Sequence, residues 1–232
     1  MIVHKCLKRI PSFFRISSEA SSLKVLSKFP FHMQLLCNLQ PLTSIFTINH
    51  KSKMAATPVV FILGSGPRIG ASVAEKFASN GYKVAIASRK GTGNTTDKGY
   101  LSLKADFTKP DTVPALFDAV KTAFQTFPSV VIYNAAALTP PPEKDSVLSI
   151  LGENVALDLN VNTVSPYVAA QQAIRGWKTL PKETKKTFIF TGNISNVSIV
   201  PMPMTINLGM GKAASAYWIG VVSTLNAAEE FR

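Results

Sequence analysis

The stretch GSGPRIG, residues 64–70, has the residue types and spacing that could bind a pyrophosphate. It follows an apolar run and precedes a segment of helical periodicity, which favours phosphate binding over a purely structural glycine turn. Gly64 permits a tight turn, Gly66 lets the backbone approach the pyrophosphate, and Gly70 allows close packing of helix on strand. The start of the helix adds free N–H groups and a positive dipole end. The predicted phosphate-binding residues are Gly64, Ser65, Gly66, Arg68, Ile69 and Gly70.

The next predicted strand ends in IASRKG, at the place where a dinucleotide-binding fold reads the adenosine ribose. Arg89 and Lys90 suit a 2′-phosphate there, whereas an acidic residue would accept from a free 2′-hydroxyl. The sequence therefore favours NADP over NAD, with two solvated surface charges as the alternative. Asp106, which follows the third predicted strand, could hydrogen-bond the adenine amino group or cap the following turn.

Lys212 lies in TINLGMGKAAS, which is predicted to begin a helix. Leu208 stands four residues earlier on the same helical face and has no proton to donate. All histidines and cysteines lie at or before residue 50, so residues 54–232 contain neither. Thiol nucleophiles, histidine bases and His/Cys metal sites are therefore excluded from that part of the chain, and no metal site is predicted.

Apolar runs alternate with helical patterns from residue 58 onward. Later strands are predicted near Tyr100–Leu103 and within SVVIYNAAA and KTFIFTG, and later helices at Thr112–Phe127, Gly152–Trp177 and from Thr205. Pro166 should kink or break the second of these helices. The alternation predicts an α/β domain with a doubly wound, parallel, Rossmann-like sheet, whose ligands bind at the carboxyl ends of the strands.

The net charge of +12 is concentrated in a basic, serine-rich extension, residues 1–53, which carries +7, whereas residues 54–232 carry only +5. Nucleic-acid binding by the domain at 54–232 is therefore not expected. The extension has the pattern of a mitochondrial transit peptide, and an upstream misannotated start before Met54 is the alternative. The expected location is cytoplasmic, or mitochondrial if the extension is a genuine transit peptide. No run of about 18 apolar residues predicts a membrane span.

Residues Pro58 to Gly220 resemble the short-chain dehydrogenase/reductase family. The glycine stretch, Asp106 and the stretch YNAA match family motifs in the family's order, with Arg68 where the common pattern has another glycine. The resemblance assigns Asp106 to the adenine contact and includes Asn134 among the cofactor-binding residues. It implies a fold that binds a nicotinamide dinucleotide and an oxidoreductase activity by hydride transfer.

The resemblance also implies a catalytic set. Asn160, in LDLNVNT, matches the asparagine whose carbonyl holds a water, with Asn162 as the weaker contender, and Ser195 matches the serine that hydrogen-bonds the substrate carbonyl. Lys212 matches the lysine that contacts the nicotinamide ribose and lowers the pKa of a tyrosine, but Leu208 occupies the place of that tyrosine. Among the other tyrosines, Tyr217 and Tyr167 are expected to lie elsewhere, and the direction of Tyr133 is open.

These residues predict an NADP-binding oxidoreductase for a small carbonyl or alcohol substrate, with weak or non-standard proton donation. A non-catalytic nucleotide sensor or interaction protein is the alternative. The chain ends 20 residues after Lys212, where the family adds two strands and a substrate lid, so the last strands of the sheet are expected to be missing. An exposed edge at the fifth strand would then favour a homo-oligomer.

Overall fold

The computed structural model describes residues 57–226. The predicted extension at 1–53, with every cysteine and histidine of the chain, lies outside the described residues, and so do residues 227–232. No helix within the described range is long and apolar enough to cross a membrane.

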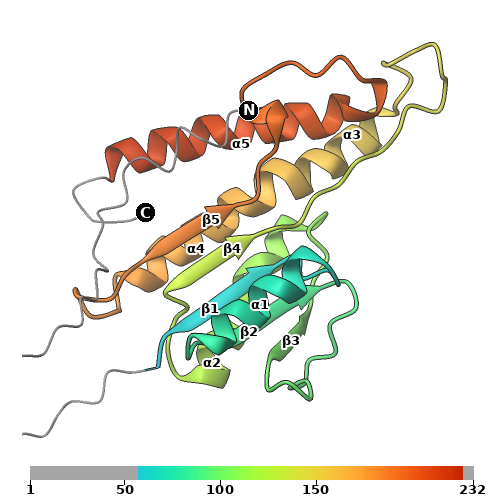
Figure 1. Cartoon of the computed structure of the whole chain (residues 1–232). Coiled ribbons are helices and arrows are strands. Elements are labelled where there is room, and N and C mark those ends of the chain that lie inside the picture. Colours follow the sequence, from blue (N-terminus) through green and yellow to red (C-terminus); the bar gives the residue numbers. More distant parts are fainter. Residues whose placement is uncertain (1–56, 227–232) are drawn as a thin grey trace, which may run out of the picture. The chain divides into compact units, whose positions relative to one another are not determined.

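The described part of the chain forms a parallel sheet of five strands in the order β3-β2-β1-β4-β5 (Figure 1). Leu63 is paired with Ala87 on one side and with Tyr133 on the other, so β1, β2 and β4 end at the same edge. The strands are β1 (Val59–Leu63), β2 (Lys83–Ser88), β3 (Leu101–Lys104), β4 (Val130–Tyr133) and β5 (Thr187–Phe190). The predicted Rossmann-like, doubly wound α/β fold is confirmed.

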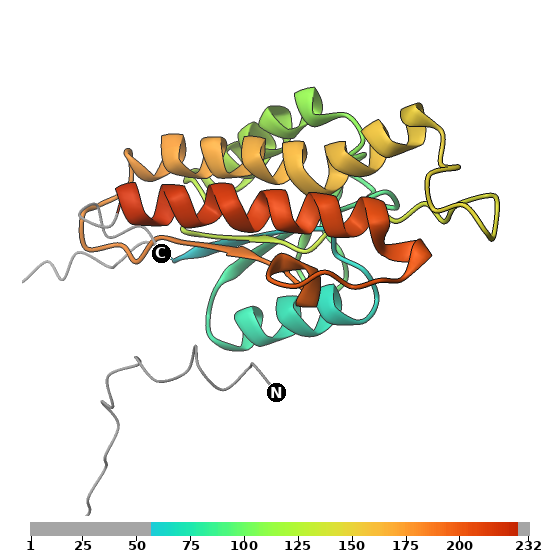
Figure 2. The same cartoon turned by 90° about the horizontal axis from the view of Figure 1, so that it is seen from above.

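Helices cover both faces of this sheet, which explains why β1 and β4 are apolar at every position. One core cluster joins alternate strand residues such as Phe61 to α2 and α4, and the other joins Ile62 and its neighbours to α1. Figure 2 shows α5 lying alongside α4. The helices are α1 (Ile69–Ser79), α2 (Val113–Phe124), α3 (Gly152–Leu159), α4 (Ser165–Trp177) and α5 (Ile206–Leu225).

The long helix predicted at Gly152–Trp177 is interrupted by a π-helical segment, Asn160–Val164, between α3 and α4. Pro166 stands in the first turn of α4 and has no N–H, so it cannot donate to the carbonyl of Asn162 four residues earlier. The hydroxyl of Ser215 on α5 donates to that carbonyl instead, at 2.7 Å. The helix therefore runs past Pro166 without a gap, as α3, the π-helical segment and α4 in succession, and the Asn162 carbonyl that the proline cannot reach becomes an anchor for α5.

Candidate functional site

The glycine stretch forms a tight turn between β1 and α1. Gly64 has a φ of +95°, and a Cβ there would lie 2.3 Å from the backbone N of Ala135, so only glycine fits. A Cβ on Gly70 would lie 2.6 Å from the Cα of Ser65, whereas Gly66 is exposed and would meet nothing within 4 Å. A side chain therefore has no space at Gly64 or Gly70, whereas the backbone at Gly66, the glycine predicted to face a pyrophosphate, can be approached by a ligand.

Cationic side chains stand beside this turn at the ends of neighbouring strands. The N–H groups of Gly64 and Ser65 both donate to the carbonyl of Ala87 near the end of β2, which brings the turn next to the loop carrying Arg89 and Lys90. Both of these side chains are exposed, and the ion pair among the described residues is between Lys98 and Glu75. Neither cation is therefore held by a carboxylate of residues 57–226.

Asp106 is exposed after β3, and its Oδ1 accepts from both the N–H and the hydroxyl of Thr108, at 3.1 and 2.7 Å. The two hydrogen bonds hold the pKa of this carboxyl below its usual value, and the charges of Lys109 and Arg89 lower it further. Arg89 follows β2 and Asp106 follows β3, and the N–H of Ala105 donates to the carbonyl of Ser88, so Arg89 and Asp106 stand at one edge of the sheet. The second carboxylate oxygen remains available to a hydrogen-bond donor such as an adenine amino group.

A chain of three hydrogen bonds connects Lys212 to the glycine turn. The Nζ of Lys212 donates to the carbonyl of Thr191 at 2.7 Å, and the hydroxyl of Thr191 donates to Oδ1 of Asn134 at 3.0 Å. The Nδ2 of Asn134 then donates to the carbonyl of Gly64 at 2.9 Å. Three predicted residues are thus tied together through Thr191, which sequence reasoning missed, and the amide of Asn134 holds the turn in place.

Lys212 is buried in α5 without a carboxylate partner. Its Nζ lies 4.3 Å from the centroid of the Phe190 ring, and only 4% of the residue is exposed. Burial lowers the pKa of the ammonium to about 8. The lysine is therefore placed at the carboxyl end of β5 with a proton that it holds less tightly than an exposed lysine does.

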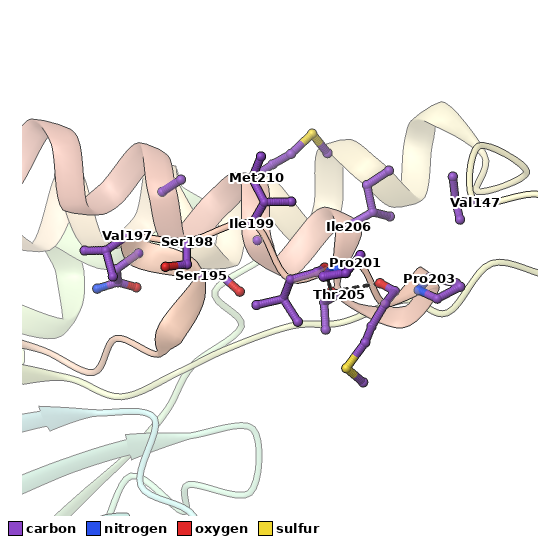
Figure 3. A pocket seen from close by; sticks show the side chains of 15 residues that line it. Val147, Ser195, Val197, Ser198, Ile199, Pro201, Pro203, Thr205, Ile206 and Met210 are labelled. Carbon is purple, nitrogen blue, oxygen red and sulfur yellow. Dashed lines mark hydrogen bonds between the residues drawn. The ribbon is translucent and has the colours of Figure 1, made fainter. Parts of the chain in front are cut away.

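Ser195 is buried in a short 3₁₀ turn, Ile194–Asn196, that follows β5. Asn193 and Asn196 cap this turn, and Oδ1 of Asn193 accepts from the N–H of Ser195 at 3.0 Å. A Cβ built on Gly209 would lie 3.8 Å from the serine hydroxyl oxygen, so Ser195 faces the residue next to Leu208. The hydroxyl also lines a cavity of about 730 Å³ between this segment and α5 (Figure 3).

The two candidate asparagines lie on different sides of the π-helical segment. Asn160 donates from Nδ2 to the carbonyl of Thr108 at 3.0 Å, which places its side chain toward the loop after β3. Asn162 is fully buried against α5, because a Cβ built on Gly211 of α5 would lie only 2.4 Å from the Cβ of Asn162. The structure therefore brings Asn162, the weaker contender, next to the residue that precedes Lys212, and it directs the side chain of Asn160 elsewhere.

None of the three tyrosines discussed above replaces the missing acid at Leu208. Tyr133 is fully buried and its hydroxyl donates to the carbonyl of Val161 at 2.7 Å, and burial raises the pKa of this phenol well above its usual value. Tyr167 is 45% exposed with its ring against Trp218, and Tyr217 is 77% exposed. The expectation that Tyr167 and Tyr217 lie elsewhere is confirmed, and the open direction of Tyr133 is settled.

A buried carboxylate near the start of α5 was not anticipated. Oδ2 of Asp158 on α3 accepts from the backbone N–H of Thr139 at 2.8 Å and from Nδ2 of Asn207 at 3.1 Å. Asp158 and Asn207 are 4% and 2% exposed. The hydrogen bond holds Asn207, the residue adjacent to Leu208, against α3. The sequence could not predict this contact because Asp158 and Asn207 lie far apart along the chain.

Known proteins resemble this chain in sequence and in fold. Residues 66–215 match the family model described as Enoyl-(Acyl carrier protein) reductase. The short chain dehydrogenase/reductase dmxR12 of Cryptosporiopsis sp. (strain 8999) is 33% identical over 188 residues, which cover 76% of this chain and 74% of that relative.

Two solved structures show the same fold at lower identity. A 3-oxoacyl-(acyl-carrier protein) reductase from Brucella melitensis in complex with NAD has a TM-score of 0.65 and 19% identity, covering 75% of this chain and 70% of that chain. A short chain dehydrogenase from Burkholderia cenocepacia J2315 in complex with NADP has a TM-score of 0.62 and 21% identity, with the same coverage of each chain. From the family model and the 33% identical relative, the chain belongs to the short-chain dehydrogenase/reductase family of oxidoreductases, with the NAD(P)-binding fold of that family.

Proposed function

We propose that the chain binds NADP(H) and interconverts a small carbonyl compound and its alcohol by hydride transfer, with weak proton donation. The observation that carries the choice of cofactor is the pair of exposed cations, Arg89 and Lys90, in the loop beside the glycine turn. Two cations suit a 2′-phosphate, since charged hydrogen bonds to phosphate are the strong ones. The similar solved structures bind NAD in one case and NADP in the other, so they leave this choice to the residues.

The residues around the turn fit a dinucleotide. The open approach at Gly66 and the N-terminus of α1 would hold the pyrophosphate, and Asp106 would accept from the adenine amino group. A bound NADPH would supply the hydride for the carbonyl carbon and become NADP⁺, and the carbonyl oxygen would take its proton from water to give the alcohol. Lys212, which donates to the carbonyl of Thr191, would contact the nicotinamide ribose.

The side chains on the substrate side differ in what they could contribute to the transfer. The hydroxyl of Ser195 would donate to the carbonyl oxygen and polarise it. The family resemblance assigns the proton-carrying water to Asn160, whose side chain donates to the carbonyl of Thr108. Asn162 is less suited to hold it, because it is fully buried and both its side-chain oxygen and nitrogen are bonded to the backbone of Ala137. Leu208 supplies no proton, which makes the proton step the slow part of the proposed reaction.

A second candidate, cofactor binding without turnover, is favoured by Leu208 alone. In that case the dinucleotide-binding residues would bind the nucleotide, the bound state would be recognised by a partner, and no ketone would be reduced. Steady oxidation of NADPH in the presence of a ketone panel supports the enzyme. Tight NADPH binding without any ketone-dependent oxidation supports the sensor.

The cofactor proposal is tested by titrating NADPH and NADH into the full chain and following protein fluorescence. We expect NADPH to bind at least about tenfold more tightly, and the double variant Arg89→Ala with Lys90→Ala to lose most of that preference. The control, Lys182→Ala with Lys185→Ala, removes the same charge from an exposed loop and should keep the preference. Equal affinities in the unmodified protein would refute the choice of NADP.

A further inference from the structure

The cavity beside Ser195 has a polar end and an apolar body. In Figure 3, Ser195 and Ser198 lie with Val197 toward one end, Val147 and Pro203 lie toward the other, and Ile206 and Met210 of α5 lie between them. The third hydroxyl of the lining, that of Thr205, lies away from the two serines and is bonded to the carbonyls of Val200 and Met202. Its volume of about 730 Å³ falls within the range of cavities that hold small organic ligands. The serine proposed to meet the carbonyl thus lies toward one end of a mainly hydrocarbon space.

The lining carries no charge. Among the described residues that form the wall, none is Asp, Glu, Lys, Arg or His. An ionised group moved from water into such a wall is strongly disfavoured, because no opposite charge replaces its hydration. A phosphate-bearing arm of a carrier-bound substrate would also find no cation in this lining, in contrast to the loop that carries Arg89 and Lys90.

We propose that the substrate is an uncharged ketone or aldehyde with an extended apolar body. Its carbonyl oxygen lies at Ser195, and its body runs along Ile206 and Met210 toward Val147. This inference rests on the proposed carbonyl chemistry, and it adds the substrate class. Covering the apolar side chains of the wall with the apolar body of the ligand is favourable because both are removed from water. The serine hydroxyls at one end would orient the single polar group of the ligand.

The apolar wall on α5 predicts where specificity can be changed. Ile206 and Met210 are one helical turn apart, so they present one surface to the cavity, and Ala213 extends it by a further turn. Met210 is 43% exposed, which leaves room for a longer side chain. A cation placed at Met210 or Ala213 should therefore convert the apolar wall into one that accepts a carboxylate.

The test measures binding by calorimetry, with the full chain, 2-undecanone and the analogue of this ketone that ends in a carboxylate. We expect the neutral ketone to bind at least about tenfold more tightly than the carboxylate. Met210→Arg should lower this ratio at least about tenfold, and Ala213→Arg should lower it in the same direction. Met204→Arg is the matched control, because Met204 is exposed near the start of α5 but does not line the cavity.

Equal affinity for the two compounds, tighter binding of the carboxylate, or no binding of either would overturn the inference. A ratio that stays unchanged in folded Met210→Arg and Ala213→Arg would overturn it as well. These readouts need no turnover, so they remain distinct from the proposed function. That function fails separately if NADPH does not bind, or if no ketone is reduced although the ketone occupies the cavity.

Discussion

Two regions of the proposed site differ in how many of the expected residues they contain: the edge where β1, β2 and β3 end, called here the cofactor edge, and the start of α5. At the cofactor edge the turn is closed around Gly64, and cations and a carboxylate stand at the ends of the neighbouring strands. At α5 the lysine is held by β5 and the serine is in place, but Leu208 occupies the position of the acid. Side-chain hydrogen bonds from Lys212, Thr191 and Asn134 thus hold the proposed site together although a leucine stands where the family resemblance expects the acid.

Restoring the acid should produce the largest change. Leu208→Tyr places a phenol one turn before Lys212, where the buried ammonium favours its ionised form. We expect ketone reduction to rise at least tenfold, toward the 10²–10⁴-fold that a positioned general acid typically contributes. Initial rates of NADPH oxidation at saturating ketone measure it, with Leu208→Phe as the control that adds a ring without a hydroxyl.

An unchanged rate in Leu208→Tyr, with NADPH binding intact, would mean that another group already supplies the proton. In the combined variant Leu208→Tyr with Lys212→Ala, the gain should disappear because the tyrosine loses the neighbouring charge.

Two glycines of one turn should respond differently to the same methyl group. Gly64→Ala forces a Cβ against Ala135 and a positive φ, and should lower the free energy of unfolding by more than about 2 kcal/mol. Gly66→Ala meets open space, so its stability should stay within about 1 kcal/mol of the parent while NADPH affinity falls at least about tenfold. Denaturant unfolding and NADPH titration separate the two. Similar affinity losses with no stability difference would contradict this division.

Removing the buried carboxylate should loosen the start of α5. Asp158→Asn replaces the charged oxygen, Oδ2, that accepts from both the Thr139 N–H and Asn207 Nδ2 with a neutral amide oxygen, and should cost about 1–3 kcal/mol of unfolding free energy because hydrogen bonds to charged acceptors are stronger. Asp118→Asn, on the exposed side of α2, is the matched control and should change stability by less than about 0.5 kcal/mol. Equal melting curves for the two variants would show that the Asp158 contacts contribute nothing.

The smallest effect is a pH dependence from Lys212. Its pKa of about 8 in the folded protein lies below the usual value of 10.5, so the unfolded chain binds more protons between these values. The destabilisation by burial is therefore complete below pH 8 and declines as the pH rises toward 10.5. Between pH 7 and pH 9 the unmodified protein should gain about 1 kcal/mol of unfolding free energy relative to Lys212→Met. A parallel pH dependence in the two proteins would refute the lowered pKa.

Local signals predicted the fold and the cofactor edge from the sequence. The glycine stretch lies within seven consecutive residues, and the apolar runs of β1 and β4 follow from burial on both faces. Lys212 and Ser195 are predicted from the family resemblance, in which Leu208 stands at the place of the tyrosine. These features need no knowledge of which distant side chains meet.

The remaining contacts depend on helix phase and on partners far apart in the sequence. One added residue in a π turn rotates everything beyond it by about 100°, so periodicity could not decide between Asn160 and Asn162. Asp158 meets Asn207 across 49 residues, and Thr191 meets Asn134 across 57. Nothing in the residues between them predicts these pairs.

The freed carbonyl of Asn162 has a consequence for the order in which the molecule assembles. Its donor, Ser215, lies 53 residues later in the chain, so the bond closes a long loop and cannot form while α5 is separate. Until then the carbonyl needs water, because Pro166 offers it no N–H. We therefore expect α5 to dock onto a partly hydrated π segment late in folding, when the rest of the sheet is already covered. Refolding of Ser215→Ala should then keep its rate, while its unfolding becomes faster.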